Sequence, residues 1–513
     1  MAMDLLAIES FSWTPHLETA ADICAKQAQA GHSVGFAFVD VDNPDEDTER
    51  SALRFLGCRP ANKVAHLTRL LEPLGVTRVG SPMLAPAAYM EVARFANPRI
   101  ASVDELRRLS YKGAHLGLGV ASSLVSYTEQ SSPDIARSRK LVERYLLASA
   151  LVFEAAHYLI KQWRPRSILV FNGRFACSKP ITEAARQLGV GCLFYERGAT
   201  FQHYSIQHRP IHDRSYRREC IAVAWDNAPV GRENIGRSFF TRRRRGDGIG
   251  WVSYTGNQTS GLVPPRRRTR RLVYFASSDY EFAEVDDTIR HTCCSSQSDA
   301  IERLVEWTRS HADTELIIRL HPRMHRISRR ERRFWRQLNS ANVFVDAPLS
   351  ETDSYALAES ADVVLTYGST MGVEAAFLGK TVIALCDCDY TGFDCVYEPA
   401  TVGELSDLLG QTQLPPKASE RCLPFGYYFL TFGTLYRFYQ PTSLFEGTFM
   451  GAKLTRDSEF VRRIRASGVG TTVARLRAIA RRLRWLGRAP SSRAFSRRFK
   501  HLLVAGLLAE TQE

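Results

Sequence analysis

The stretch that most constrains the fold is residues 361–385, ADVVLTYGSTMGVEAAFLGKTVIAL. Residues 362–366 form a short apolar run rich in β-branched side chains, which is typical of a buried parallel strand. A turn at residues 367–370 opens a helical pattern, which Gly379-Lys380 closes, and a second apolar run covers residues 381–385. This order of strand, turn, helix and strand predicts a parallel α/β sheet.

The turn before that helix has the composition of an anion site. Gly368 precedes two hydroxyl side chains, Ser369 and Thr370, and the first N–H groups of the helix. A helix N-terminus carries partial positive charge and unpaired donors, so it suits a phosphate. The alternative is that Ser369 or Thr370 only caps the helix. A second motif favours the functional interpretation, because Arg319-Leu320-His321-Pro322-Arg323 closes another apolar strand.

Similar patterns divide the chain into two α/β halves. At the start, two apolar runs flank an amphipathic helix, and a βαβ unit of this length requires a parallel sheet with a right-handed crossover. We expect strands over residues 5–9, 33–39, 167–171 and 191–195 in the first half, and over 272–275, 315–320, 343–345, 362–366 and 381–385 in the second. We expect helices over 17–30, 62–73, 84–95, 135–162, 179–188, 299–310, 329–338, 353–360 and 400–411.

Two segments are candidates for the connection and the interface between these halves. Residues 241–271 are rich in Gly, Pro and Arg and have no clear period, which predicts a linker between a domain at 1–240 and a domain at 272–440. The alternative is that the charges of this segment line a cleft for an anionic substrate. The strongly aromatic residues 425–439 are expected to pack across the interface between the halves.

The net charge of the chain is concentrated in its last part, which we assign to a tail at 441–513. Residues 453–500 hold 15 Lys and Arg against two acids, so +13 of the formal +14 lies there. Residues 473–486 place apolar side chains on one helical stripe, arginines opposite and Trp485 near the edge. This pattern predicts an amphipathic helix on an anionic membrane surface. The alternatives are an Arg-rich helix docked on the protein or nonspecific nucleic-acid contact.

The cysteines and the apolar runs limit the cellular setting. The chain has 11 cysteines, and residues 1–10 lack the basic start of a signal peptide, which predicts reduced thiols and a cytosolic protein. No apolar run approaches the roughly 20 residues of a membrane span. Cys386, Cys388 and Cys395 match no common zinc spacing, so we expect no metal and no cofactor.

Polar residues follow several of the predicted strands. Asn172 and Arg174 come after the strand at 167–171, and Glu196 and Arg197 after the one at 191–195. In an open α/β sheet, ligands bind outside the carboxyl ends of the strands. These residues are therefore candidates for binding or catalysis.

Two α/β halves joined near the middle resemble the GT-B glycosyltransferases. The segment Gly31-His32-Ser33-Val34 is similar to the opening of their acceptor-side domains. The second half resembles bacterial capsule and surface-polysaccharide transferases, including those that use CMP-sugars such as Kdo or sialic acid. In that group, a strand-ending His-Pro and a Ser/Thr turn before a Glu-Ala helix hold the phosphate of the donor. The matching positions here are His321-Pro322, Ser369-Thr370 and Glu374-Ala375.

Three further segments resemble the same group. Residues 275–281, FASSDYE, are similar to the first donor-side loop of capsule-synthesis proteins, and residues 172–174 and 195–198 also have counterparts. The chain departs from the sialyltransferase pattern, because we find no acidic pair followed by Gly at a strand end of the first half. The resemblance implies the following substrate-binding residues: Asn172, Arg174, Arg197, Ser277, Ser278, Glu281, His321, Arg323, Gly368, Ser369, Thr370 and Glu374.

The resemblance implies a metal-independent transferase that moves a sugar from a nucleotide-activated donor to a lipid-linked or growing surface glycan. It would work at the inner face of the bacterial cytoplasmic membrane, with the tail as its contact and no nucleic-acid partner. Glu196 is the first candidate for the base that takes the proton of the acceptor, and His16 the second. Alternatives are a polyol-phosphate transferase, a nucleotide-sugar epimerase, and a non-catalytic scaffold or nucleic-acid-binding protein.

Overall fold

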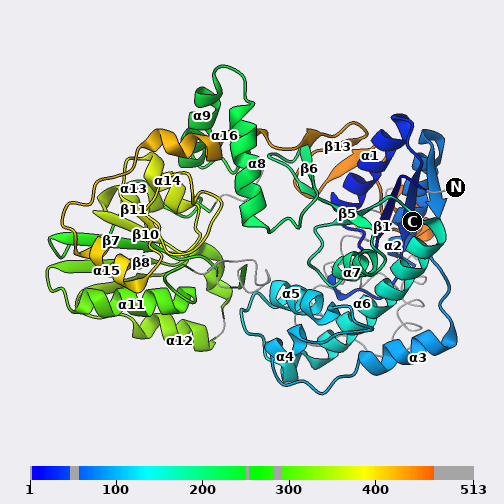
Figure 1. The fold of residues 1–513 in the computed structure, drawn as a ribbon, viewed down its shortest axis with the longest axis horizontal. Coiled ribbons are helices and arrows are strands. Elements are labelled where there is room, and N and C mark those ends of the chain that lie inside the picture. The colour runs from blue at the N-terminus through cyan, green and yellow to red at the C-terminus, as the bar shows by residue number, and fades with distance from the viewer. Residues whose placement is uncertain are drawn as a thin grey trace, which may run out of the picture.

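The computed structural model describes residues 3–46, 57–249, 254–278, 280–281, 292–327 and 329–466. Two β-sheets, each flanked by helices, form separate lobes (Figure 1). The first lobe is built mainly from the N-terminal half of the chain and the second mainly from the C-terminal half. This arrangement confirms the predicted fold class, an α/β protein with two Rossmann-like domains.

The first sheet has seven strands in the order β12-β6-β5-β4-β1-β2-β3. Strands β1 to β5 are parallel, whereas β6 and β12 run antiparallel to their neighbours. The chain winds outward in one direction from β1 and in the other from β4, so the switch point lies between these two strands. The strands are β1 (Leu5–Glu9), β2 (Val34–Phe38), β3 (Val76–Val79), β4 (Ser167–Phe171), β5 (Gly191–Arg197), β6 (His203–Gln207) and β12 (Thr434–Leu435).

The second sheet has five parallel strands in the order β11-β10-β7-β8-β9. Its switch point lies between β7 and β10, and β10 is the strand that opens the segment at 361–385. The strands are β7 (Arg270–Phe275), β8 (Thr314–Arg319), β9 (Val343–Asp346), β10 (Val363–Thr366) and β11 (Val382–Ala384).

Helices cover both faces of each sheet, and those predicted from the sequence are present. In the first lobe they are α1 (His16–Gln29), α2 (Pro60–Leu71), α3 (Pro86–Phe95), α4 (Val103–Arg107), α5 (Leu116–Thr128), α6 (Ile135–Trp163) and α7 (Lys179–Gln187). In the second lobe they are α11 (Gln297–Arg309), α12 (Arg329–Gln337), α13 (Ser354–Ser360), α14 (Met371–Phe377) and α15 (Val402–Gly410). The sequence did not predict α5, which has buried residues along most of its length.

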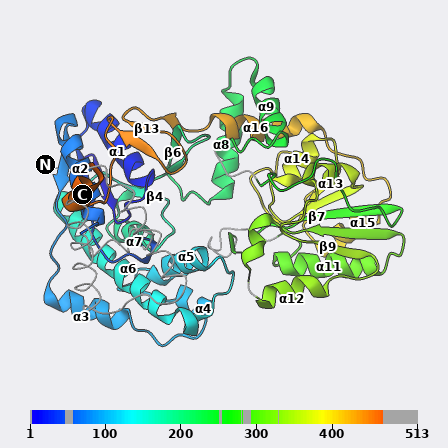
Figure 2. The same ribbon diagram turned by 180° about the vertical axis from the view of Figure 1, so that it is seen from behind.

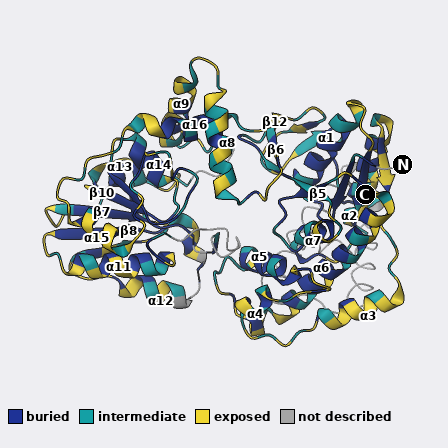
Figure 3. Cartoon of the chain, viewed as in Figure 1, coloured by how far each residue is buried: buried dark blue, intermediate teal, exposed yellow. Residues whose placement is uncertain are grey.

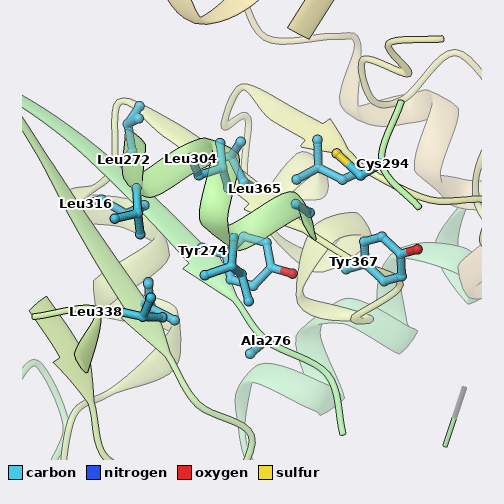
Figure 4. Close-up of a cluster of buried hydrophobic side chains, with 14 of the residues drawn as sticks. Leu272, Tyr274, Ala276, Cys294, Leu304, Leu316, Leu338, Leu365 and Tyr367 are labelled. Atoms are coloured by element: carbon cyan, nitrogen blue, oxygen red, sulfur yellow. The ribbon is translucent and has the colours of Figure 1, made fainter. Parts of the chain in front are cut away.

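Strands β8, β10 and β11 of the second sheet are buried along their whole length, whereas the edge strand β9 exposes Phe344 (Figure 3). On one face, Leu272 and Tyr274 of β7 pack with Leu316 of β8, Leu365 of β10 and Leu304 of α11 (Figure 4). A separate buried cluster covers the opposite face and includes Val273 and Val364. These two clusters fix the positions of the loops that follow the strands.

Three helices stand between the lobes (Figure 2). They are α8 (Arg214–Asp226), α9 (Arg232–Arg244) and α16 (Leu423–Thr431). Phe240 of α9 stacks on Phe377 with ring centroids 4.2 Å apart, and Phe239 lies 5.7 Å from Phe425 of α16. Helix α9 therefore packs with the core of the second lobe, although it precedes residue 272.

The aromatic stretch at 425–439 crosses from one lobe to the other. Phe425 and Tyr428 are buried with the second sheet, whereas Tyr436 contacts Tyr204 of the first at 5.2 Å. The chain then forms the hairpin of β13 (Tyr439–Pro441) and β14 (Gly447–Phe449) beside α1. The buried carboxylate of Asp22 accepts hydrogen bonds from three successive backbone N–H groups of residues 437–439. The chain thus links the lobes twice, and the boundaries at 240, 271 and 440 stay predictions.

The predicted membrane helix at residues 473–486 lies outside the described residues. The last described element is α17 (Glu459–Ala466). Within the described ranges, no helix has both the length and the apolar character that a bilayer crossing requires.

Candidate functional site

A cleft of about 1150 Å³ lies between the lobes, and residues from both sheets line it. Trp13 and Arg174 follow β1 and β4, the two strands at the switch point of the first sheet. Glu281 and Arg323 follow β7 and β8 of the second sheet, and Asp389 follows β11. The carboxyl ends of both sheets therefore meet at one cavity, which is where α/β sheets bind ligands. Of the predicted residues, Arg174, Glu281 and Arg323 line it.

Arg323 is the best-connected cation on the second-lobe side of the cleft. Its Nε donates to the Tyr254 hydroxyl at 2.5 Å, and its Nη1 donates to Tyr280 at 3.2 Å and to Glu281 Oε1 at 2.9 Å. The side chain is nevertheless 43% exposed. Arg323 is thus held in place while part of its guanidinium stays accessible to an anionic ligand.

His321 begins the turn that carries Arg323. Its Nδ1 accepts a hydrogen bond from the Arg323 backbone N–H at 3.2 Å and lies 3.1 Å from Ser278 Oγ. Burial, together with the charges of Arg323 and Arg319, lowers the pKa of His321 to about 4. A neutral ring whose Nδ1 accepts carries its proton on Nε2. His321 is therefore a neutral donor through Nε2 at pH 7.

The turn at 368–370 precedes α14, as the sequence predicts. Gly368 has a φ of +79°, in the left-handed region that favours glycine. The Ser369 backbone N–H donates to Thr366 Oγ1 at 2.9 Å, and Ser369 Oγ accepts from the Met371 N–H at 3.3 Å. Thr370 is exposed and its side chain makes no capping hydrogen bond. The capping alternative thus applies to Ser369 and leaves the Thr370 hydroxyl accessible.

The structure does not bring Glu374 together with the other predicted residues. It is 2% exposed, its carboxylate accepts from the Tyr355 hydroxyl, and Arg243 Nη2 lies 3.4 Å away. These contacts tie α14 to α13 and α9. Ser277 is also buried, and its backbone N–H donates to Gln297 Oε1 at 2.8 Å, which holds the loop after β7.

On the first-lobe side, Glu196 lies at the end of β5. Its Oε2 accepts from Asn172 Nδ2 at 2.7 Å and its Oε1 from the Arg197 backbone N–H at 3.1 Å. Asn172 has a φ of +54° and is followed by Gly173 at +90°, so the turn after β4 points its amide at the carboxylate. The Arg197 guanidinium lies 5.0 Å from the centre of the Phe445 ring.

His16 is the first residue of α1 and packs against aromatic rings. Its ring centroid lies 4.0 Å from that of Phe171. Burial, together with the charges of Arg197 and Lys63, lowers the pKa of His16 to about 3. The ring is neutral at pH 7 and weakly basic, which makes it a poorer proton acceptor than an ordinary histidine.

The sequence analysis did not select Glu9, which ends β1, or the cleft residues on and before α8. Glu9 is 2% exposed and accepts from the Tyr195 hydroxyl at 2.9 Å, and burial raises the pKa of its carboxyl well above the ordinary value. As a polar residue at a strand end, it satisfied the rule that selected Glu196.

The other residues that the sequence analysis did not select lie on and before α8. His212, Arg214 and Arg217 line the cleft, and Arg217 donates to Asp389 Oδ2 at 2.8 Å. Arg214 donates to the Asp387 carbonyl oxygen. Helix α8 thereby holds the loop after β11 against the cleft.

No metal cluster is present among the described residues: no group of three or more His, Cys, Asp or Glu side chains is placed to bind an ion there. All 11 cysteines are free thiols, and most of them are buried.

Comparison with known proteins supports part of the sequence interpretation. A family model described as "Capsule polysaccharide biosynthesis protein" matches residues 281–393, from Glu281 through the turn at 368–370 to the loop after β11. A search of curated proteins finds no match.

Solved structures give low similarity scores. The KpsC β-Kdo 2,4-transferase of Thermosulfurimonas dismutans has 12% identity over 51% of this chain and 78% of its own, with a TM-score of 0.33. The β-Kdo 2,7-transferase of the same organism has 15% identity over 53% of this chain and 80% of its own, with a TM-score of 0.31. The UDP-GlcNAc 2-epimerase of Neisseria meningitidis has 10% identity over 83% of this chain and 99% of its own, with a TM-score of 0.27. The architecture therefore rests on the strand order, and the resemblance to capsule polysaccharide biosynthesis proteins is confirmed over the residues that the family model matches.

Proposed function

We propose that the protein is a glycosyltransferase that moves a sugar from a nucleotide-activated donor to a lipid-linked or growing cell-surface polysaccharide. One observation carries this proposal: residues that follow the strands of both sheets line a single cleft. A donor on one lobe and an acceptor on the other would then meet between them. The match to capsule-synthesis proteins supports the choice of substrates, and CMP-linked sugars are the first donors to test.

The second lobe would bind the nucleotide and its phosphate. The leaving phosphate gains negative charge as the glycosidic bond breaks, and preorganised donors stabilise that charge. Arg323 supplies a positioned guanidinium, His321 a neutral Nε2–H, and Thr370 an accessible hydroxyl. These groups can act without a metal ion.

The first lobe would bind the acceptor. The acceptor oxygen attacks the anomeric carbon of the donor, the bond from that carbon to the phosphate oxygen breaks, and the nucleotide leaves with the electron pair. Glu196 is the proposed base that takes the acceptor proton. Asn172, 2.7 Å away, would hold the carboxylate in position.

Attachment to the inner face of the bacterial cytoplasmic membrane through the basic tail is part of the proposal. It rests on the sequence of residues 453–500, because the structure describes that tail only as far as Ala466.

A thermal-shift screen of the full chain against CMP, CDP, UDP and GDP tests the proposal. A nucleotide that binds the folded state raises the unfolding temperature in a concentration-dependent way. A shift with CMP alone indicates a CMP-linked donor, and a shift with another nucleotide changes the donor but keeps the transferase. The shift should be lost in His321→Ala and kept in His311→Ala, because His311 precedes β8 and so lies at the opposite end of that strand from His321. No shift with any of the four nucleotides contradicts the proposal.

A further inference from the structure

The first lobe contains a second groove, which shares only Asn172 with the residues of the proposed proton transfer. Its volume is about 420 Å³, and its walls come from α5, α7, β5 and the stretch after β6. Arg174 and His212 line both this groove and the main cleft. The two cavities are therefore neighbours, and a chain-like ligand in the cleft can extend into the groove.

Polar atoms of three neutral groove residues are buried and have no hydrogen-bond partner in the part of the chain that the structure describes. They are Ser122 Oγ, Asn172 Oδ1 and His212 Nε2. Ser122 is 4% and Asn172 3% exposed. The orientation of the Asn172 amide is fixed by chemistry, because its Nδ2 must donate to the Glu196 carboxylate, which leaves Oδ1 as an acceptor.

Such atoms are rare because a buried polar group that lacks a partner destabilises the fold. Three of them along one groove indicate that a bound molecule with several hydroxyl groups completes their hydrogen bonds. The groove also offers an apolar surface, since Phe194 lines it. A Cβ added at Gly173 would lie 2.5 Å from Phe194 Cε1, so this close packing of turn and ring requires glycine.

The charges along the groove favour a negative ligand. Lys179 and Arg186 of α7 and Arg174 contribute three cations, against one carboxylate, Glu183. Glu183 lies 3.4 Å from Lys179 Nζ and accepts from Arg186 Nη2 at 2.8 Å. One carboxylate shared by two cations leaves an excess of positive charge on this wall.

We propose that this groove binds a sugar unit that carries a carboxylate. Its hydroxyl groups would pair with Ser122, Asn172 and His212, and its carboxylate would lie near Lys179 and Arg174. This deepens the proposed function and rests on it in one respect: the bound unit is the part of the acceptor next to the one that reacts. Asn172 connects the two places, because it lines the groove and holds Glu196.

Binding of two probes to the full chain tests the proposal without turnover. Glucuronate and glucose differ by a carboxylate, and saturation-transfer NMR measures millimolar affinities for both. We expect glucuronate to bind more tightly. Ser122→Ala should weaken both probes by about two- to tenfold, the effect of one neutral hydrogen bond. It should not lower the unfolding temperature, because the hydroxyl it removes has no partner among the described residues.

Lys179→Gln should weaken glucuronate and leave glucose unchanged. Lys161→Gln, which changes an exposed lysine of α6, is the matched control and should affect neither. Equal binding of the two probes, insensitivity to Ser122→Ala, or an equal effect of Lys161→Gln would overturn the proposal. So would binding of inorganic phosphate at the affinity of glucuronate, because the groove would then select charge and not a sugar.

The nucleotide screen separates this inference from the proposed function. Lys179→Gln should retain the nucleotide-dependent thermal shift of the unmodified chain. Glucuronate binding without any nucleotide shift would contradict the transferase and keep the saccharide groove. A nucleotide-dependent thermal shift without glucuronate binding would support the transferase and contradict the saccharide groove.

Discussion

The residues at the strand ends of the two lobes differ in how fully their hydrogen bonds are satisfied. In the second lobe, Arg323 is fixed by three side chains and His321 by two contacts to Nδ1. In the first lobe, Glu196 is positioned by Asn172, while buried atoms of Asn172 and His212 have no hydrogen-bond partner among the described residues.

This difference suits two kinds of ligand. The phosphate of a nucleotide-sugar has the same geometry whatever the sugar. Hydrogen-bond donors that are already in position can therefore bind it without reorganisation. In the proposed function, the hydroxyl groups of an acceptor glycan would pair with the first-lobe polar atoms that lack a partner among the described residues. The family match covers residues 281–393, within the second lobe, to which the proposed function assigns the nucleotide.

The largest effect is expected from Glu196→Gln. The amide keeps the size of the side chain but cannot take a proton, so turnover should fall by about 10²–10⁴-fold. Nucleotide binding should be unchanged, because Glu196 belongs to the other lobe. The measurement is release of the nucleotide from the donor in the presence of acceptor. Glu302→Gln on the exposed face of α11 is the control, and equal turnover of the two variants would remove Glu196 from the reaction.

Arg323→Ala should act on the donor. Loss of a charged hydrogen bond to phosphate costs about 1.5–3 kcal/mol, so nucleotide affinity should fall by about 10- to 100-fold. Titration calorimetry with the nucleotide found in the screen measures it. Arg333→Ala changes an exposed arginine of α12 and should have no effect. A normal affinity in Arg323→Ala would place the phosphate elsewhere.

Each lobe also contains a buried ion pair, which allows its stability to be tested separately. Lys63 lies 2.6 Å from Glu18 in the first lobe, and Arg271 lies 2.7 Å from Glu315 in the second. Lys63→Met and Arg271→Met each leave a buried carboxylate without its cation, which costs about 3–5 kcal/mol. Lys63 also donates to the Ser12 carbonyl, so its loss should loosen the loop that carries Trp13.

Scanning calorimetry is the measurement, and each substitution should lower the unfolding transition of its own lobe. In the first lobe, Lys63→Met combined with Glu18→Leu should recover most of the loss, because no unpaired charge remains. Failure of this recovery would show that Lys63 acts mainly through its contacts to the loop.

The smallest effect concerns pH. The pKa of His321 is about 4 in the folded protein and 6.5 is its ordinary value, so between these values the unfolded chain binds a proton that the folded chain does not. Stability should therefore fall as the pH drops from about 6.5 toward 4. His321→Asn keeps an acceptor for the Arg323 N–H and should flatten this slope in urea unfolding. An unchanged slope would assign the acid sensitivity to other groups, among them His16.

The sequence predicted those parts of the fold whose signal is local. Strands such as β1 and β4 are continuous apolar runs because both faces of a parallel sheet are covered. Helix α5 was missed because it is apolar on most sides and so lacks an amphipathic period. A Cβ at Gly117 would lie 2.0 Å from the Leu106 carbonyl oxygen, so its glycine serves close packing, which the sequence does not reveal.

The sequence predicted those site residues that directly follow a strand. This rule placed Arg174 and Arg323 at the cleft, and it would also have selected Glu9, which ends β1 and is buried. It did not show that Glu374 faces Tyr355 and Arg243, because the face on which a helical residue lies depends on how the helix packs. The contact of Arg217 with Asp389 joins residues 172 positions apart, which no local pattern reveals.

Hydrogen–deuterium exchange of the full chain, with and without the stabilising nucleotide, tests the division of labour between the lobes most directly. The account predicts slower exchange in the segments after β7, β8 and β10, at residues 276–278, 320–324 and 368–371. The segments after β4 and β5, at residues 172–174 and 196–198, should exchange as before. Protection of the first-lobe segments with none in the second lobe would contradict the account.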